Sequence, residues 1–203
     1  MTKEAFAEIA HVSRETLDRL EAYAGLLRQW QSAVNLVGAD TLDDLWRRHM
    51  LDSAQLTAHI PENGDITDFG SGAGFPGLVL SIMLDRPVHL VESIGKKAAF
   101  LREAARITGA HATVHLGRIE DQDIWPAPII TARALAPLDL LLDYAEPYYR
   151  LAGADACCLF LKGARAEEEL TEAAKNWTMA VERFSSVSDP KGVVLRFRDI
   201  ARD

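Results

Sequence analysis

The sequence predicts an α/β protein with a doubly wound, mostly parallel sheet, an antiparallel closing hairpin and additional helices at the N-terminus. From residue 65 onward, apolar runs typical of strands alternate with helical runs, as in parallel strands joined by crossover helices. The glycine-rich run 68–77 joins a strand-like run to a helical one, where doubly wound sheets bind their ligands. The 203 residues, 48% of them hydrophobic, are enough for one packed domain with a helical appendage.

Two helices are expected before the sheet. The first covers residues 4–30, and its apolar side chains share one face at a period of 3.6: Leu17, Leu20, Ala24, Leu27 and Trp30. The second covers residues 42–59 and ends before Pro61. We therefore expect an N-terminal helical extension, 1–60, packed as one unit with a main domain, 61–203.

The main domain should contain five parallel strands, at 65–69, 88–92, 112–116, 128–132 and 156–162. Helices are expected between and after them, at 76–84, 96–109, 137–149 and 165–175. Residues 180–186 and 193–197 flank Asp189-Pro190-Lys191-Gly192 and predict the closing hairpin. The adjacent Cys157 and Cys158 lack the spacing of a metal site and would form a strained disulfide, so we expect buried, reduced thiols.

Charge and hydropathy limit the class of function. No apolar run reaches the roughly 20 residues of a membrane span, and the first residues lack a signal-peptide core, so a cytoplasmic protein is expected. The net charge of −8 argues against a protein that coats nucleic acid without regard to site. Basic residues nevertheless gather near the glycine-rich run, which suits a restricted RNA contact; scattered solvated charges are the alternative.

The glycine-rich run has the spacing Gly-x-Gly-x-Gly, at Gly70, Gly72 and Gly74, with Ser71 between the first two. The dinucleotide fingerprint would need glycine or alanine where Phe75 stands. Together with the acidic Asp68 before the first glycine, this spacing indicates S-adenosylmethionine. A tight turn without a ligand is the alternative.

Three strand ends extend this candidate site. Glu92 closes the second strand, next to Ser93, where an acid accepts hydrogen bonds from ribose hydroxyls. Ile119 and Glu120 follow the third strand, where an adenine would lie. Arg133 closes the fourth, where its guanidinium can hold a carboxylate, a phosphate or the target base. The alternatives are a helix-capping acid at Glu92, an ordinary polar loop at Ile119 and Glu120, and a surface ion pair at Arg133.

The helix at 42–59 carries Arg47, Arg48, His49 and Asp52. His49 and Asp52 are three residues apart and share a face, and Arg48 is expected to pair with Asp52. One histidine and one aspartate make a poor metal set, so no metal site is predicted. No serine lies in a nucleophile-elbow motif, which disfavours a hydrolytic triad. A helix-packing network explains these residues as well as a contribution to the site does.

The ordered motifs of the chain resemble the bacterial RsmG family, formerly called glucose-inhibited division protein B. These are class I methyltransferases with a Rossmann-like fold that methylate N7 of a guanine in small-subunit (16S) ribosomal RNA. The resemblance covers about residues 15 to 200. It is carried by the segments 35–37, 48–53, 68–77, 92–97, 100–102, 133–134 and 161–163.

The resemblance implies cofactor contacts at Gly70, Phe75, Ile119, Glu120 and Arg133. Arg133 and His49 are the candidate catalytic residues. Guanine N7 carries a free lone pair and needs no general base, and an arginine near guanine O6 could stabilise the charge that develops on the base. Basic side chains would hold RNA phosphates; the candidates are Arg47, Arg48, Lys96, Lys97, Arg102 and Arg118.

The expected partner is small-subunit ribosomal RNA or the ribosomal subunit, bound by a monomer. Two alternatives remain open. One is an S-adenosylmethionine-dependent methyltransferase of another substrate, and the other is a non-catalytic module that binds the cofactor.

Overall fold

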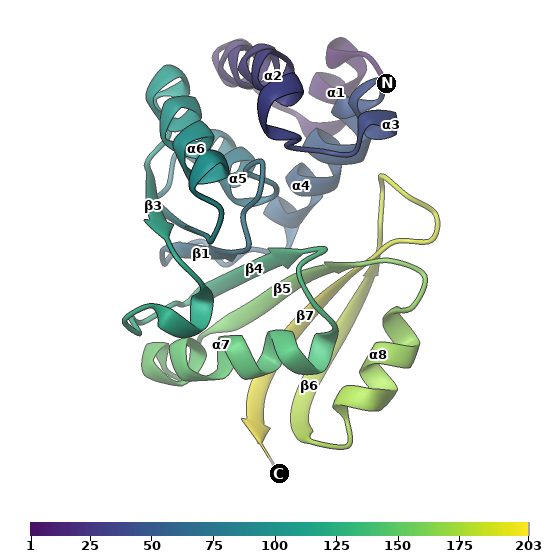
Figure 1. Cartoon of the computed structure of the whole chain (residues 1–203). Coiled ribbons are helices and arrows are strands. Elements are labelled where there is room, and N and C mark those ends of the chain that lie inside the picture. Colours follow the sequence, from purple (N-terminus) through teal and green to yellow (C-terminus); the bar gives the residue numbers. More distant parts are fainter. Residues whose placement is uncertain (203) are drawn as a thin grey trace.

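A seven-stranded sheet forms the centre of the computed structural model, which describes residues 1–202 (Figure 1). The strand order is β3-β2-β1-β4-β5-β7-β6. β1 to β5 are parallel, whereas β7 lies antiparallel between β5 and β6. This confirms the predicted α/β fold and its closing hairpin. The strands are β1 (Ile66–Phe69), β2 (Val88–Glu92), β3 (Ala112–Leu116), β4 (Ile129–Arg133), β5 (Cys157–Lys162), β6 (Trp177–Ser185) and β7 (Val193–Arg202).

Helices cover both faces of the sheet (Figure 1). On one face, α5 (Gly77–Leu84) and α6 (Gly95–Thr108) pack together with the N-terminal helices. On the other face lie α7 (Leu138–Ala152) and α8 (Ala166–Ala173), and the short turn η3 (Ile119–Asp121) precedes β4. The chain order reverses between β1 and β4, so the carboxyl ends of these strands open a crevice at one edge.

The single helix predicted at 4–30 is wrong in one respect, because the chain forms two helices there. These are α1 (Lys3–Ala10) and α2 (Arg14–Val34). His11 adopts a left-handed conformation with φ of 50°, and the Ser13 hydroxyl accepts a hydrogen bond from the Thr16 N–H at 3.1 Å. The serine side chain thus begins a new helix instead of continuing the old one.

The second predicted helix, at 42–59, is also broken up. It becomes α3 (Ala39–Leu42), the π-helical turn η1 (Trp46–Leu51), the short α4 (Asp52–Ala54) and the 3₁₀ turn η2 (Gln55–Ala58). A π-helical turn accommodates an extra residue, which rotates the following side chains relative to a regular helix. Periodicity alone does not reveal such a change of phase.

Two hydrophobic clusters fill the two faces of the sheet. The first joins α1 and α2, through Phe6 and Tyr23, to residues of β5 and β7, so residues 1–60 share their core with the main domain. The second lies under α7 and α8. Cys157 contributes to the first cluster and Cys158 to the second; both are buried and free, as predicted, and burial raises the pKa of each thiol. Within residues 1–202, no helix has both the length and the apolar character of a membrane span.

Candidate active site

The glycine loop, residues 70–74, joins β1 to α5 at the carboxyl edge of the sheet. Gly72 and Gly74 have φ of 57° and 97°, which disfavour any other residue. A Cβ on Gly74 would lie 2.7 Å from the Tyr23 hydroxyl oxygen, so this side of the loop is tightly packed. A Cβ on Gly72 would have only the Gly70 carbonyl oxygen within 4 Å, at 3.7 Å. The outer side of the loop is therefore bare backbone that a ligand can approach.

Glu92 ends β2 beside this loop and is buried. Its Oε2 accepts a hydrogen bond from the Gly72 N–H at 2.8 Å, and its Oε1 accepts one from the Ile94 N–H at 2.7 Å. Each oxygen keeps a second lone pair for a hydroxyl group of a ligand. Ser93, the next predicted site residue, is exposed on the same rim.

Asp68 lies directly beneath the loop and is fully buried. Its Oδ1 accepts a hydrogen bond from the Thr131 hydroxyl at 2.8 Å, whereas its Oδ2 has no hydrogen-bond partner within the described residues. Burial raises the pKa of Asp68 to about 6, although hydrogen bonding from Thr131 opposes the shift. From the sequence alone Asp68 is only the acidic residue of the glycine-rich motif, because its burial depends on strands that lie beside β1. Ser71, a predicted cofactor residue, is buried and donates its hydroxyl to the Asp68 carbonyl at 2.9 Å.

The turn after β3 reaches the same edge of the sheet. Gly117 N–H donates to the Glu92 carbonyl at 3.0 Å and fixes this turn beside β2. Ile119 is buried and Glu120 is exposed, and the Tyr148 hydroxyl donates to the Ile119 carbonyl at 3.2 Å. The structure thus brings the glycine loop, Glu92 and the turn at Ile119 to one edge, as the sequence predicts.

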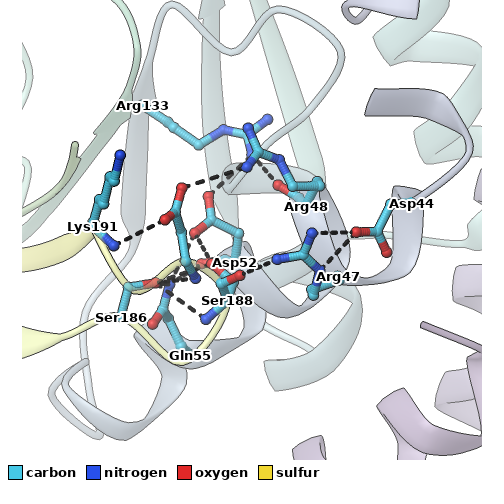
Figure 2. Close-up of polar contacts among 10 residues, drawn as sticks. Asp44, Arg47, Arg48, Asp52, Gln55, Arg133, Ser186, Ser188 and Lys191 are labelled. Carbon is cyan, nitrogen blue, oxygen red and sulfur yellow. Dashed lines mark hydrogen bonds and ion pairs between the residues drawn. The ribbon is translucent and has the colours of Figure 1, made fainter. Parts of the chain in front are cut away.

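Arg133, at the end of β4, is the centre of a polar cluster (Figure 2). Its Nη1 donates to Asp52 Oδ2 and to the Arg48 carbonyl, each at 3.2 Å, and its Nη2 donates to His49 Nδ1 at 2.8 Å. The guanidinium also lies 5.1 Å from the centre of the buried Phe75 ring. Because that ring faces the interior, a ligand can reach position 75 only at its backbone.

His49 is held in a single tautomer by its neighbours. Since Nδ1 accepts from Arg133, the ring proton is on Nε2, which donates to Thr41 Oγ1 at 2.8 Å. Burial, followed by the charges of Arg133 and Arg48, lowers the pKa of His49 to about 3. The ring also stacks on Phe75 with centroids 4.9 Å apart. His49 is therefore neutral near pH 7 and positions its neighbours.

The predicted pair between Arg48 and Asp52 is wrong. Asp52 instead pairs with Arg133, and its Oδ1 accepts hydrogen bonds from Ser188 Oγ at 2.5 Å and from Gln55 Nε2 at 3.0 Å. Arg48 and Asp52 thus each pair with a residue that is distant in the sequence, Asp189 and Arg133, which spacing along one helix does not reveal.

The hairpin turn 186–192 packs against the segment 47–55 through the same cluster (Figure 2). Arg48 forms an ion pair with Asp189 at 3.4 Å. Arg47 pairs with Asp44 and donates to the Ser188 carbonyl at 2.9 Å. Arg47, a predicted RNA-binding residue, thus contacts a structural partner through each of its three guanidinium nitrogens.

A cavity of about 790 Å³ opens at the carboxyl ends of β4 and β5, beside the Arg133 cluster. Its charged lining consists of four basic side chains, Arg48, Arg133, Lys162 and Arg165, and three carboxylates. Asp189, Asp52 and Glu169 pair with Arg48, Arg133 and Lys162, respectively. Leu135 connects the cavity to the glycine loop. It lines the cavity, and its Cδ1 atom lies 2.6 Å from the position that a Cβ on Gly70 would take. The cavity therefore lies next to the glycine loop, on the side of Arg133.

The predicted RNA-binding residues fall into two groups on either side of the glycine loop. Arg47 and Arg48 lie on the side of the cavity. The second group lies on and after α6, beyond β2: Lys96, Lys97, Arg102 and Arg118. Arg102 donates to the Val114 carbonyl at 3.5 Å, and Arg118 lies 3.8 Å from Glu120.

The sequence profile of the family described as "GidB: rRNA small subunit methyltransferase G" matches residues 16–193. The chain belongs to this family. "Ribosomal RNA small subunit methyltransferase G" of Rhodospirillum rubrum is 55% identical over 203 residues, covering all of both chains. The protein of that name from Rhodospirillum centenum is 56% identical over 94% of this chain and 87% of its own. The chain is thus an S-adenosylmethionine-dependent methyltransferase.

Solved structures show the same fold at low sequence identity. The methyltransferase resembles the glycopeptide N-methyltransferase MtfA complexed with S-adenosylhomocysteine, with a TM-score of 0.60 and 9% identity over 73% of this chain and 89% of that one. It also resembles an O-methyltransferase from Bacillus cereus in complex with S-adenosylhomocysteine, with a TM-score of 0.59 and 13% identity over 87% and 90%. Both support a class I, Rossmann-like methyltransferase fold.

Proposed function

We propose that this methyltransferase transfers a methyl group from S-adenosylmethionine to N7 of a guanine in small-subunit (16S) ribosomal RNA, as a cytoplasmic monomer. One observation carries the proposal beyond family membership. The glycine loop, which fits a nucleoside cofactor, lies against a cavity of about 790 Å³ that is lined by four basic side chains and three carboxylates, and Leu135 joins the two. A methyl donor and a nucleotide acceptor bound at these places would be neighbours.

The residues at the sheet edge fit S-adenosylmethionine. The bare backbone at Gly72 can approach the ligand closely, and Glu92, already oriented by two backbone N–H groups, can accept from ribose hydroxyls. The turn at Ile119 and Glu120 would hold the adenine. When bound, the cofactor supplies an electrophilic methyl group on its sulfonium.

The cavity residues would bind and orient the acceptor. Arg48, Arg133, Lys162 and Arg165 would meet RNA phosphates, the first three while they also pair with Asp189, Asp52 and Glu169. Arg133 has five N–H donors, of which Asp52, His49 and the Arg48 carbonyl engage three. The remaining donors can meet the O6 of a guanine. Holding donor and acceptor in line can supply about 7–11 kcal/mol of the barrier.

No side chain needs to remove a proton from the acceptor, because guanine N7 attacks with a free lone pair. The neutral His49 agrees with this, since its Nδ1 lone pair is occupied by Arg133 and its pKa of about 3 makes it a weak base. Its contribution is to hold the Arg133 guanidinium and the Phe75 ring in place.

The test is methyl transfer from isotopically labelled S-adenosylmethionine to small ribosomal subunits from cells that lack this protein, followed by mass spectrometry of the nucleosides. We expect labelled N7-methylguanine. Arg133→Lys should reduce the rate at least about tenfold, because a single ammonium cannot bridge three acceptors and still meet a base. The control Arg150→Lys changes an exposed arginine that pairs with Glu146 on α7 and should leave the rate unchanged.

Other outcomes identify the alternatives. Label in a different nucleoside would reject the N7 assignment, and label only in protein or small molecules would reject the RNA substrate. Cofactor binding without transfer to any of them would indicate a non-catalytic module.

A further inference from the structure

We propose that Tyr23 and Tyr148 are positioning residues for the cofactor, each holding one cofactor loop through a hydroxyl-to-carbonyl hydrogen bond. The two tyrosines approach the sheet edge from opposite faces, one from α2 and the other from α7. The proposal rests on the cofactor pocket alone and does not depend on which nucleotide is methylated.

Tyr23 lies in the middle of α2 and is completely buried. Its hydroxyl donates to the Ala73 carbonyl, inside the glycine loop. Its ring packs against Phe75, with centroids 5.4 Å apart, and against Phe100 at 6.2 Å. Position 74 must be glycine for this hydroxyl to fit, since a Cβ there would lie only 2.7 Å from it. The N-terminal helix α2 thus holds the glycine loop from the side of the first hydrophobic cluster.

Tyr148 plays the corresponding part on the other face. Its hydroxyl donates to the Ile119 carbonyl at 3.2 Å, in the turn expected to hold the adenine. Its ring is buried and makes edge-to-face contacts with Phe69 and Trp125, with centroids 5.2 and 5.1 Å away. The Gln122 N–H donates to the same carbonyl at 3.2 Å, and the Asp121 N–H donates to the Arg118 carbonyl at 3.2 Å. The N–H groups of Ile119 and Glu120, unpaired among the described residues, would then point toward a base.

Tyr149, the next residue on α7, is a matched control. It is also buried, and its hydroxyl also bonds the backbone, accepting from the Asp199 N–H at 2.8 Å. That bond joins α7 to β7 and touches neither cofactor loop. Removing the Tyr149 hydroxyl therefore costs a similar bond at a place that should not affect the cofactor.

The experiment compares Tyr23→Phe, Tyr148→Phe and Tyr149→Phe in the full chain. Titration calorimetry with S-adenosylhomocysteine should show about three- to tenfold weaker binding for the first two variants, as expected for a lost hydrogen bond, and unchanged binding for Tyr149→Phe. Without ligand, amide hydrogen exchange should accelerate in residues 70–75 for Tyr23→Phe and in residues 117–122 for Tyr148→Phe. Thermal unfolding of all three should shift by similar amounts.

Steady-state kinetics provide a second readout. We expect KM for the cofactor to rise in Tyr23→Phe and Tyr148→Phe more than kcat falls. Unchanged S-adenosylhomocysteine affinity in both variants, or an equal loss in Tyr149→Phe, would overturn the proposal. Wild-type protein that binds S-adenosylhomocysteine but does not methylate ribosomal RNA would refute only the proposed substrate.

Discussion

Asp68 shows how one buried carboxyl beneath the glycine loop couples the site to pH. Burial raises the pKa of Asp68 from 3.8 to about 6, so between these values the folded protein binds more protons than the unfolded chain. The contribution of Asp68 to stability is consequently highest at low pH and falls as pH rises through this window. At pH 7 the carboxylate of Asp68 is ionised and buried, and its Oδ2 has no hydrogen-bond partner among the described residues. This lowers the free energy of unfolding at a place beside the cofactor site.

We predict that Asp68→Asn removes this pH dependence, because the amide does not ionise. Between pH 4.5 and 7.5, wild-type protein should lose about 2 kcal/mol of unfolding free energy relative to the variant. Urea unfolding at both pH values measures the difference. Asp40→Asn, at an exposed position, should follow the wild type. Parallel pH profiles for all three proteins would show that Asp68 has an ordinary pKa.

At the scale of elements, the glycine loop and the turn η1 combine two kinds of irregular backbone around Arg133. The loop leaves its outer surface bare, and η1 directs His49 and Asp52 to the guanidinium. Irregular turns of this kind are frequent at functional sites. Regular helices and strands hold both of them in place.

We predict that Gly72→Asp abolishes cofactor binding and leaves the fold intact. The new carboxylate would stand on the bare side of the loop, beside Glu92, in the space and charge environment that the ligand needs. Gly109→Asp is the matched control: its φ of 64° imposes a similar backbone cost of about 1 kcal/mol, and no neighbouring atom lies within 4 Å of its Cβ position. Calorimetry with S-adenosylhomocysteine separates the two. Near-normal affinity in folded Gly72→Asp would contradict the loop assignment.

Over the whole molecule, the charge is unevenly distributed. The chain has a net charge of −8, yet basic residues line the cavity and the start of α6 on both sides of the glycine loop. Within the described chain, Lys96 and Lys97 form no ion pair with a carboxylate. Such a protein would attract RNA at this edge and repel it elsewhere.

We predict that Lys96→Ala weakens RNA binding and reduces its salt dependence. One lost phosphate contact should lower the slope of log K against log salt by about 0.7 for a single strand or 0.9 for a duplex. Cofactor affinity should stay the same. The control Lys175→Ala removes an exposed lysine that pairs with Glu172, and should alter neither quantity. If both variants bind RNA like the wild type, the RNA must dock along the cavity side, through Arg48 instead.

The sequence predicted the sheet, its crossover helices and the cofactor edge, because these depend on local periodicity and on one turn motif. It did not predict the partners of Arg133. The bond between Ser188 and Asp52 joins residues 136 positions apart, and the π-helical turn that ends just before Asp52 has no periodic signature. Tyr23 and Tyr148 were missed for a similar reason, since a buried tyrosine on a helix gives no sign of which carbonyl it meets.

The first hydrophobic cluster has a consequence for how this chain is made. It unites Phe6 with Val194, so 188 residues must be added after the first of them before the cluster can close. At ribosomal speeds of about 5–20 residues per second, this takes roughly 10–40 s. During that interval the apolar face of α2 lacks the partners that β5 and β7 later provide. The exposed apolar side chains of nascent α1 and α2 can then bind a chaperone. An enzyme proposed to act on ribosomal RNA would thus complete its own core only after a ribosome has added Val194.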